Sequence, residues 1–318
     1  PLMPGGGLKG TLGTLAAGNM KVNPFPEEVI KDTRSELRKY LNGQGFGTGA
    51  PHSGDIDQIM EIRLLQALMV AFGDPDSHLC DWLAKGVWLG SPERRLPRTP
   101  ALYARKVKWP HNDPDLYLHG EWTTNYGTLK DHENQVLRQY ADEVKDGMMI
   151  EMSLGEAIDE YGADLVIAAT GAIAKKGKAP DDEVRVIYDG THGVALNYGI
   201  KIRDQVRFPT APDVKAMLSE IAEEPGPNYS LDFDVSKAHR RCQVLRSEWG
   251  RQACQVKGSA AATFQEKRTL RNGRKVISKS DFSQTQLEEK VYLNKVGTFG
   301  VTSAGYWWGR TGGATVRV

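Results

Sequence analysis

Cysteine is scarce in this chain, with only Cys80, Cys242 and Cys254 among 318 residues. Three cysteines at such wide spacings cannot build a disulfide framework, and the spacings match no zinc-binding motif. Unpaired cysteines are typical of reducing compartments. We therefore expect an intracellular setting, with the nucleus as one alternative.

Long hydrophobic runs are also missing. The longest, from Leu165 to Ala174, is about half of the roughly 20 residues that a membrane-spanning helix needs. We therefore expect no membrane partner. The chain begins at Pro1 rather than Met and carries no evident secretory signal, so both ends have the look of cuts in a longer reading frame.

Net charge is close to balance, at +1, which argues against a uniformly basic coat for nucleic acid. The charge is unevenly spread, however. Between Val235 and Ser280 there are twelve Lys or Arg residues and two acidic residues. Such a block favours salt-dependent phosphate binding, although a solvated basic surface is the plain alternative. Within it, the candidate nucleic-acid-binding residues are Lys237, Arg240, Arg241, Arg271, Arg274 and Lys275.

Composition allows one or two ordinary hydrophobic cores, because 40% of the side chains are hydrophobic and 25% are charged. Residues 1–24 are rich in glycine and predict a flexible lead-in. Residues 25–150 predict a mainly α-helical region, and strand patterns appear only in residues 151–318. The fold class expected from this order is α+β.

Hydrophobic periodicity and turn residues predict the individual elements. The Ser153-x-x-Glu156 spacing predicts a capping box at the start of a helix. The other expected helices cover residues 26–41, 55–72, a short segment around 79–83, 128–144, 213–223 and 236–256, and the expected strands cover 165–169, 184–188, 229–233, a hairpin over 269–277, and 291–293.

One carboxylate stands out. Asp234 ends an apolar run and precedes a basic segment. A carboxylate fixed at a strand end is a suitable ligand for Mg²⁺, which prefers oxygen donors and is commonly shared between carboxylates and substrate phosphates. The alternatives are that Asp234 caps the following helix, or that Asp232 is the ligand instead.

Four short motifs occur along the chain, and all four resemble motifs of one family in that family's order. Asp234-x-x-x-Ala238-His239 resembles the first catalytic-aspartate motif of reverse transcriptases, and its wording is close to retrotransposon versions. Upstream, Arg185-x-x-x-Asp189 followed by Leu196-Asn197 resembles the fingers motif, with about three extra residues before the Asn. The segments Phe208 to Val214 and Gly300 to Trp308 resemble, respectively, the Pro-x-x-x-Asp-Leu segment before the palm strand and the glycine-serine motif of the palm.

This resemblance implies a partial right-hand polymerase, with fingers and an incomplete palm over residues 151–318. It implies a Mg²⁺ cofactor held by Asp234 and the Val235 carbonyl, and partners that are RNA or DNA template-primer and deoxynucleotide triphosphates. It implies that Arg185 on a fingers hairpin clamps the triphosphate. The substrate-binding residues implied are Arg185, Asp189, Val235, His239, Gly300 and Ser303.

The chain departs from the family in two ways. No Tyr-x-Asp-Asp motif occurs before Val318, so two of the three expected metal-binding aspartates are absent. His239 stands where the family usually has Tyr or Phe, which leaves sugar discrimination open. We therefore expect a reverse-transcriptase fragment from a retroelement that is inactive by itself, its parent catalysing template-directed, Mg²⁺-dependent nucleotidyl transfer.

Two alternatives belong to other classes. The basic block is also typical of a non-catalytic nucleic-acid-binding module from a decayed element, and a plain interaction domain would make every motif coincidental. Three further patterns have ordinary explanations. His192 is expected to be a loop residue, Trp307-Trp308 to be helix-packing core, and Gly171 to Lys178 to lack the spacing of a phosphate-binding loop.

Overall fold

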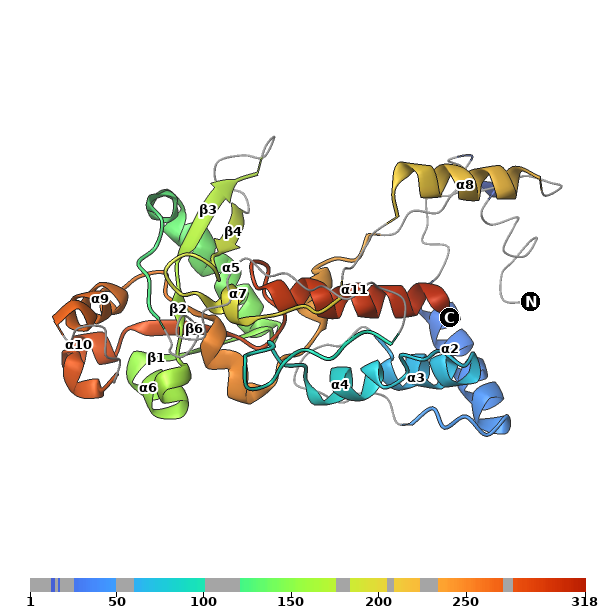
Figure 1. The fold of residues 1–318 in the computed structure, drawn as a ribbon, viewed down its shortest axis with the longest axis horizontal. Helices are drawn as coiled ribbons and strands as arrows, with labels where there is room; N and C mark the ends of the chain where they lie inside the picture. The colour runs from blue at the N-terminus through green and yellow to red at the C-terminus, as the bar shows by residue number, and fades with distance from the viewer. Residues whose placement is uncertain are drawn as a thin grey trace.

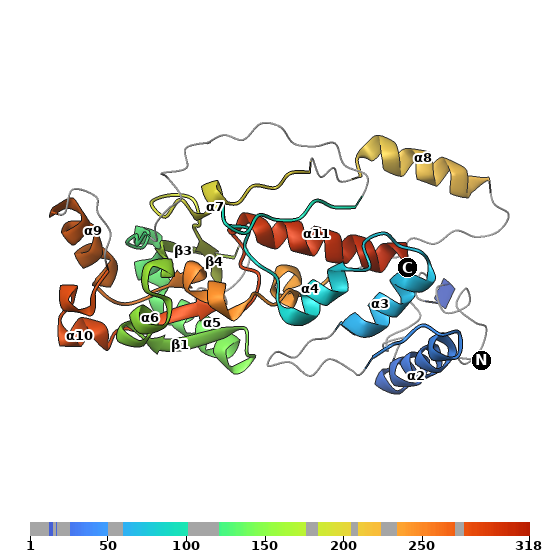
Figure 2. The ribbon, with the colours of Figure 1, turned by 60° about the horizontal axis from the view of Figure 1, so that its bottom comes forward.

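The computed structural model describes residues 13–14, 17, 26–49, 60–100, 121–175, 184–204, 209–223, 234–270 and 277–318, the side chains of 268–270 excepted. The chain is mixed α and β, which confirms the predicted α+β class at that level (Figure 1). A small sheet and a separate hairpin lie on one side, and helices α2, α3 and α4 lie toward the other (Figures 1 and 2).

The main sheet has four short strands in the order β1-β6-β5-β2. Strand β6 (Lys290–Asn294) pairs antiparallel with β1 (Met149–Ser153) and with β5 (Ala253–Cys254), and β5 pairs in parallel with β2 (Ile167–Ala168). Apart from its first residue, β6 is buried throughout, as expected for a central strand covered on both faces. The strand predicted at 291–293 is therefore confirmed.

A two-stranded hairpin stands apart from this sheet. Strand β3 (Thr170–Ala174) pairs antiparallel with β4 (Val184–Tyr188). The strand predicted at 184–188 is confirmed. The strand predicted at 165–169 is present in part as β2, but it does not form a hairpin with β4 as expected. Its backbone bonds to other segments. The Val166 amide donates to the Gly250 carbonyl, and Ile167 exchanges bonds with the 121–123 segment.

The predicted N-terminal helices are present as α2 (Glu27–Gly43), α3 (Ile62–Ala71) and α4 (Leu79–Lys85). Residues 55–59 of the second predicted helix lie outside the described residues. The predicted helix at 128–144 begins as a 3-10 helix, η2 (Gly127–His132), and becomes α5 only at Glu133–Lys145.

The predicted capping box is confirmed at the start of α6 (Leu154–Tyr161). The Glu156 amide donates to the Ser153 hydroxyl oxygen at 3.2 Å, and the Ser153 amide donates to the Glu156 carboxylate at 2.8 Å. These reciprocal bonds satisfy two backbone donors that the helix itself leaves unpaired. A 3-10 turn, η3 (Gly162–Asp164), follows.

The helix predicted at 236–256 is wrong. The segment instead contains two 3-10 helices, η4 (Ala238–Arg241) and η5 (Arg246–Gln252), and then β5. Lys237 adopts a left-handed φ of 54°, which interrupts a right-handed helix. The Val244 amide donates to the Lys295 carbonyl, so long-range pairing takes the backbone donor that an α-helix would use.

The predicted hairpin at 269–277 is wrong at its start, because helix α9 (Ala260–Leu270) includes Thr269 and Leu270. Residues 271–276, with Arg271, Arg274 and Lys275, lie outside the described residues. After them come η6 (Lys279–Asp281) and α10 (Gln284–Leu287).

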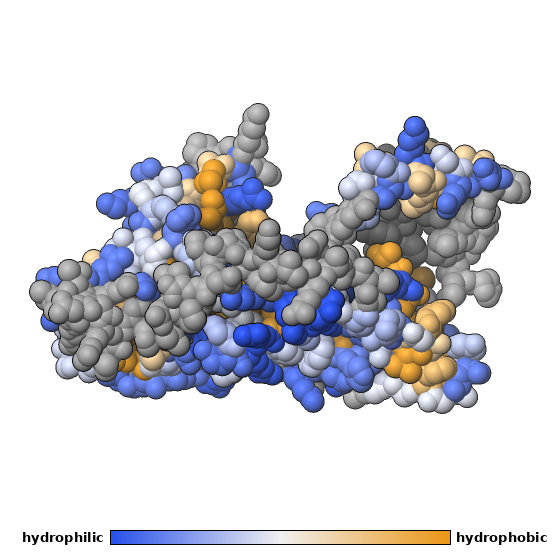
Figure 3. Space-filling model, viewed as in Figure 1, coloured by the Kyte–Doolittle hydropathy of each residue, from blue (hydrophilic) through white to orange (hydrophobic). Residues whose placement is uncertain are grey.

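Helix α8 (Ala211–Ala222) confirms the helix predicted at 213–223, whereas the strand predicted at 229–233 lies outside the described residues. The side chains of α8 are exposed, including an apolar stripe of Val214, Met217, Leu218 and Ile221. Figure 3 also shows hydrophobic side chains on the surface near the β3–β4 hairpin and around α2 and α3. The remaining helices are α7 (Leu196–Gly199) and α11 (Thr302–Arg317).

The largest hydrophobic cluster joins the N-terminal helices to α11. Trp307 is 1% exposed and packs edge-to-face against Trp82 and Trp88, with ring centroids 5.9 Å and 5.1 Å apart. The prediction that Trp307 belongs to a helix-packing core is therefore confirmed. The cluster includes residues on both sides of the predicted boundary at 150/151, and that boundary stays a prediction.

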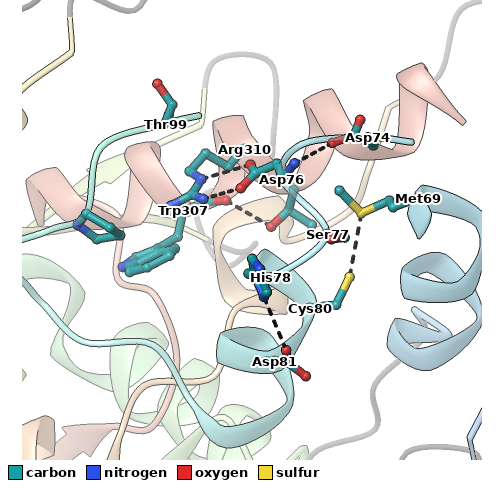
Figure 4. Close-up of polar contacts among 12 residues, drawn as sticks. Met69, Asp74, Asp76, Ser77, His78, Cys80, Asp81, Thr99, Trp307 and Arg310 are labelled. Atoms are coloured by element: carbon teal, nitrogen blue, oxygen red, sulfur yellow. Dashed lines mark hydrogen bonds and ion pairs between the residues drawn. The ribbon is translucent and has the colours of Figure 1, made fainter. Parts of the chain in front are cut away.

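A buried ion pair lies beside this aromatic cluster. Arg310 on α11 donates from Nε to Asp76 Oδ2 at 3.1 Å, and a second bond joins Arg310 Nη2 to Asp76 Oδ1 (Figure 4). Arg310 Nη1 also donates to the Tyr306 hydroxyl at 2.7 Å. Both charged side chains are almost fully buried. The pair therefore fixes α11 against the loop between α3 and α4.

No helix in the described part of the chain is both long and apolar enough to cross a membrane.

Replacing Asp76 by alanine tests this attachment. We expect Asp76→Ala to lower the free energy of unfolding by about 3–5 kcal/mol, because it leaves a buried guanidinium without its counter-charge. Urea unfolding followed by tryptophan fluorescence measures the effect. As a control, Lys39→Ala removes the exposed pair with Glu36 on α2 and should leave the midpoint unchanged. Equal effects of the two substitutions would refute the assignment.

Candidate functional site

Three of the predicted motif segments meet at one exposed aromatic ring, that of Phe299, which is 58% exposed. The guanidinium carbon of Arg185, from β4, lies 5.8 Å from the centroid of this ring. The His239 ring, from η4, lies 5.8 Å from it at an interplanar angle of 60°. Segments far apart in sequence thus place a cation and an imidazole around Phe299.

Two glycines permit this convergence. A Cβ atom on Gly300 would lie 1.9 Å from the Tyr188 carbonyl oxygen, and the φ of Gly300 is +103°. A Cβ on Gly297 would lie 2.5 Å from the His239 carbonyl oxygen. Side chains at either position would collide with backbone. The 297–300 loop therefore fits between the end of β4 and η4 only because both residues are glycine.

A shallow, open depression of about 350 Å³ surrounds the Phe299 ring. Its floor includes the first turn of α11, whose N-terminal residue is Thr302. Ser303, a predicted substrate-binding residue, is 1% exposed inside this turn, and its hydroxyl has no hydrogen-bond partner among the described residues. The depression is lined by His239, Thr298, Phe299, Gly300, Val301, Thr302, Ala304 and Gly305.

Asn197 joins the segment after β4 to the glycine loop. Its Nδ2 donates to the Gly300 carbonyl at 2.8 Å and to the Thr191 hydroxyl at 2.9 Å, and its Oδ1 accepts from the Thr302 amide at 2.8 Å. One amide side chain therefore holds three backbone or hydroxyl groups from two distant segments. Asn197 belongs to the Leu-Asn motif, yet the sequence alone did not identify this role.

Asp189 organises the same loop from the end of β4. Its carboxylate accepts from the Thr191 and His192 amides at 2.9 and 3.1 Å, from the His192 ring, and from the Tyr126 hydroxyl. Partial burial alone would raise the pKa of Asp189, but these bonds lower it to about 2. The bond to Asp189 also raises the pKa of the Tyr126 hydroxyl. His192 is an exposed loop residue, as predicted.

Asp234 and Val235 are both exposed. Within the described residues, no hydrogen bond or ion pair involves the Asp234 carboxylate, and no group of three or more His, Cys, Asp or Glu side chains is placed to hold a metal ion. Asp234 precedes His239, whose ring contacts Phe299, by five residues in the sequence.

The predicted nucleic-acid-binding residues differ in their placement. Lys237 is exposed and pairs with Asp146 at 3.1 Å, and Arg241 donates from Nε to the Ser236 carbonyl. The Arg240 side chain is only 13% exposed. It pairs with Glu143 and donates to Asn294, and burial lowers its pKa. A largely buried, paired guanidinium is less accessible to a phosphate than a surface cation, and the nucleic-acid-binding role of Arg240 stays a prediction.

The basic block is also partly neutralised by tertiary contacts. Lysines and arginines from this block pair with acids between residues 133 and 164, which the local count in the sequence left out. Besides Lys237 and Arg240, the pairs are Arg246–Glu160, Arg251–Asp164, Lys257–Glu133 and Lys279–Asp159.

Comparisons with known proteins do not identify a family for this chain. The scan against protein-family models found no match, and the search of curated proteins found none either. The site therefore has to be interpreted from its own residues.

The glycine requirement at position 300 can be tested with a matched glycine. Gly300→Ala should lower the melting temperature markedly, because the new Cβ would meet the Tyr188 carbonyl at a positive φ. Gly305→Ala, at a helical position with nothing within 4 Å of the added Cβ, should be neutral or stabilising by up to about 1 kcal/mol. Calorimetry of both variants measures this, and equal melting temperatures would contradict it.

The lowered pKa of Asp189 predicts that its contribution to stability is lost in acid. Its folded-state pKa of about 2 lies below the ordinary 3.8, so the ionised carboxylate stabilises the fold at neutral pH and loses this contribution as pH falls from about 4 to about 2. Urea midpoints of the native chain and Asp189→Asn should therefore differ most above pH 4 and converge toward pH 2. A difference that stays constant over this interval would contradict the assignment.

Proposed function

We propose that this chain is a reverse-transcriptase-like fragment of a retroelement, comprising fingers and an incomplete palm. The observation that carries the proposal is the meeting of Arg185, His239 and the Gly300 loop around Phe299. These residues come from three of the four motifs that resemble the family. Chance resemblances in unrelated loops would have no reason to converge on one exposed aromatic ring.

In this proposal the depression binds a nucleoside triphosphate. Arg185 contacts phosphate oxygens, for which a guanidinium fork is well suited. Phe299 offers an exposed ring face to the base or sugar, and His239 flanks it. Asp189 and Asn197 act as positioning residues, since their side chains are engaged in holding the loops that carry Arg185 and Gly300.

The proposal includes one magnesium ion held together with a triphosphate. The exposed Asp234 carboxylate and the Val235 carbonyl supply oxygen ligands, and Mg²⁺ commonly completes its shell with phosphates and water. When bound, Mg²⁺ neutralises the phosphate charge that develops during nucleotidyl transfer. Transfer itself generally uses two metal ions, and the 318 residues contain no Tyr-x-Asp-Asp motif to hold the second.

The proposed activity of this chain alone is therefore nucleotide and template-primer binding, with template-directed polymerisation reserved for the parent. The partners would be deoxynucleotide triphosphates and an RNA or DNA template-primer. His239 replaces the aromatic residue usual in the family, and burial lowers its pKa. A neutral imidazole beside Phe299 would preserve a flat, uncharged surface for the sugar.

The non-catalytic binding module is the weaker alternative, because ion pairs within the fold offset the basic charge that suggested it. At least six of the twelve basic residues in the 235–280 block pair with acids of the same chain. Each pair offsets one positive charge, so the block as a whole presents a smaller net charge to nucleic acid than its sequence count.

Nucleotide binding tests the proposal. With a fluorescent deoxynucleotide triphosphate and Mg²⁺, Arg185→Ala should weaken binding about tenfold or more, because a hydrogen bond to a charged group contributes about 1.5–3 kcal/mol. Phe299→Ala should weaken it about tenfold, because stacking of a base on an aromatic ring contributes about 1–3 kcal/mol. Asp234→Asn should remove the Mg²⁺-dependent part of the affinity and leave Mg²⁺-free binding unchanged. Arg34→Ala, at a half-exposed arginine of α2, is the matched control. Binding that is equal in all four variants would defeat the proposal.

A further inference from the structure

A second hollow, of about 460 Å³, lies against the loop that Asp189 organises. One wall comes from the 123–126 segment together with η2 and the start of α5. The opposite wall comes from the end of β5 and the start of α9, and Ile167 of β2 lies at the bottom. The hollow is lined by Thr123, Thr124, Asn125, Tyr126, Leu129, Lys130, Glu133, Ile167, Gln255, Val256, Lys257, Gly258 and Ala261.

Tyr126 gives this hollow a fixed aromatic surface. Its ring is 42% exposed. Its hydroxyl is bonded to Asp189, and the position of a Cβ on Gly171 would lie 3.4 Å from its ring, so β3 supports the ring from behind. A ring that is held at both its hydroxyl and one face keeps its orientation without a ligand. Such rings are suitable stacking surfaces for nucleobases.

Two exposed lysines flank the hollow from opposite walls, Lys130 on η2 and Lys257 after β5. Lys257 lies 3.7 Å from Glu133, the one acid of the lining. The anion position at the N-terminus of α9 is already taken, because the Ser259 and Ala260 amides donate to the Glu289 carboxylate. An incoming phosphate would therefore be attracted to the lysines and not to the helix end.

Hydrogen bonds within the protein join the two walls of the hollow. Asn125 donates from Nδ2 to the Gln255 carbonyl at 2.6 Å and accepts from the Thr170 amide at 2.9 Å. Thr123 Oγ1 is buried without a hydrogen-bond partner among the described residues. The hollow thus combines a rigid frame with an apolar floor.

The 189–197 loop separates this hollow from the Phe299 depression. Asp189 bonds to Tyr126 on one side, and Asn197 bonds to Gly300 on the other. A Cβ on Gly193 would lie 2.3 Å from Thr123 Oγ1, which places the loop directly against the hollow.

We propose that this hollow binds one unpaired nucleotide of single-stranded RNA or DNA, with its base on the Tyr126 ring and its phosphate between Lys130 and Lys257. The idea deepens the proposed function, on which it rests for the class of partner. It adds a strand-binding subsite to the nucleotide site at Phe299.

Fluorescence anisotropy of the full chain with a labelled 12-nucleotide single strand tests the proposal. The double variant Lys130→Ser/Lys257→Ser should bind about tenfold more weakly at low salt. Its slope of log affinity against log salt should be shallower by about 0.7, the value for one phosphate contact on a single strand. Lys39→Ser/Lys290→Ser, at two exposed lysines outside the hollow, is the matched control and should bind as the native chain does.

Tyr126 is tested by photocrosslinking. A strand containing 5-iodouridine should crosslink to the peptide that holds Tyr126, and Tyr126→Ala should abolish that crosslink and weaken binding about tenfold. Tyr126→Phe keeps the ring and should retain the crosslink. A crosslink confined to other peptides, or full competition by a free mononucleotide at the same concentration as the strand, would overturn the assignment.

The outcomes separate the two proposals. Strand binding that is unchanged in the pocket variants, together with triphosphate binding that depends on Arg185, would remove this subsite and leave the proposed function standing. Strand binding that depends on the hollow, without any triphosphate binding, would support the subsite and remove the nucleotide site. No strand binding by the native chain would overturn the subsite outright.

Discussion

The close passage of the 297–300 loop between β4 and η4 is the constraint on which the candidate site depends. Backbone meets backbone at both contacts, so the loop has no side-chain freedom with which to adjust. Arg185 and His239 reach Phe299 only while this passage is kept. The bonds of Asn197 and Asp189 maintain it from one side, and the attachment of α11 maintains it from the other.

Local sequence rules predicted the elements whose formation is local. The helices near residues 27–43 and 211–222, the Ser153 capping box and strand β6 all follow from periodicity and cap chemistry. The helix expected at 236–256 does not form, because the backbone there pairs with residues about 50 positions away. An apolar pattern alone does not distinguish that arrangement from an amphipathic helix.

The site was predictable only in part. Arg185, His239 and Gly300 were found through motif resemblance, and they do lie together. The pairing of Arg240 was not foreseen, because its partner, Glu143, lies on a separate helix and does not enter a local charge count. Phe299, Tyr126 and the bridging role of Asn197 depend on how the 189–197 loop meets α11, which no spacing within the sequence encodes.

Helix α11 carries the glycine-serine segment at its first turn and the buried Arg310 pair near its middle (Figure 4). Because a helix is stiff along its axis, displacement at one point is transmitted along it. The loop between α3 and α4, across the aromatic cluster, therefore helps to set the orientation of the depression. The N-terminal helices therefore help to hold the site in position. Deleting them would alter the geometry around Phe299 from a distance.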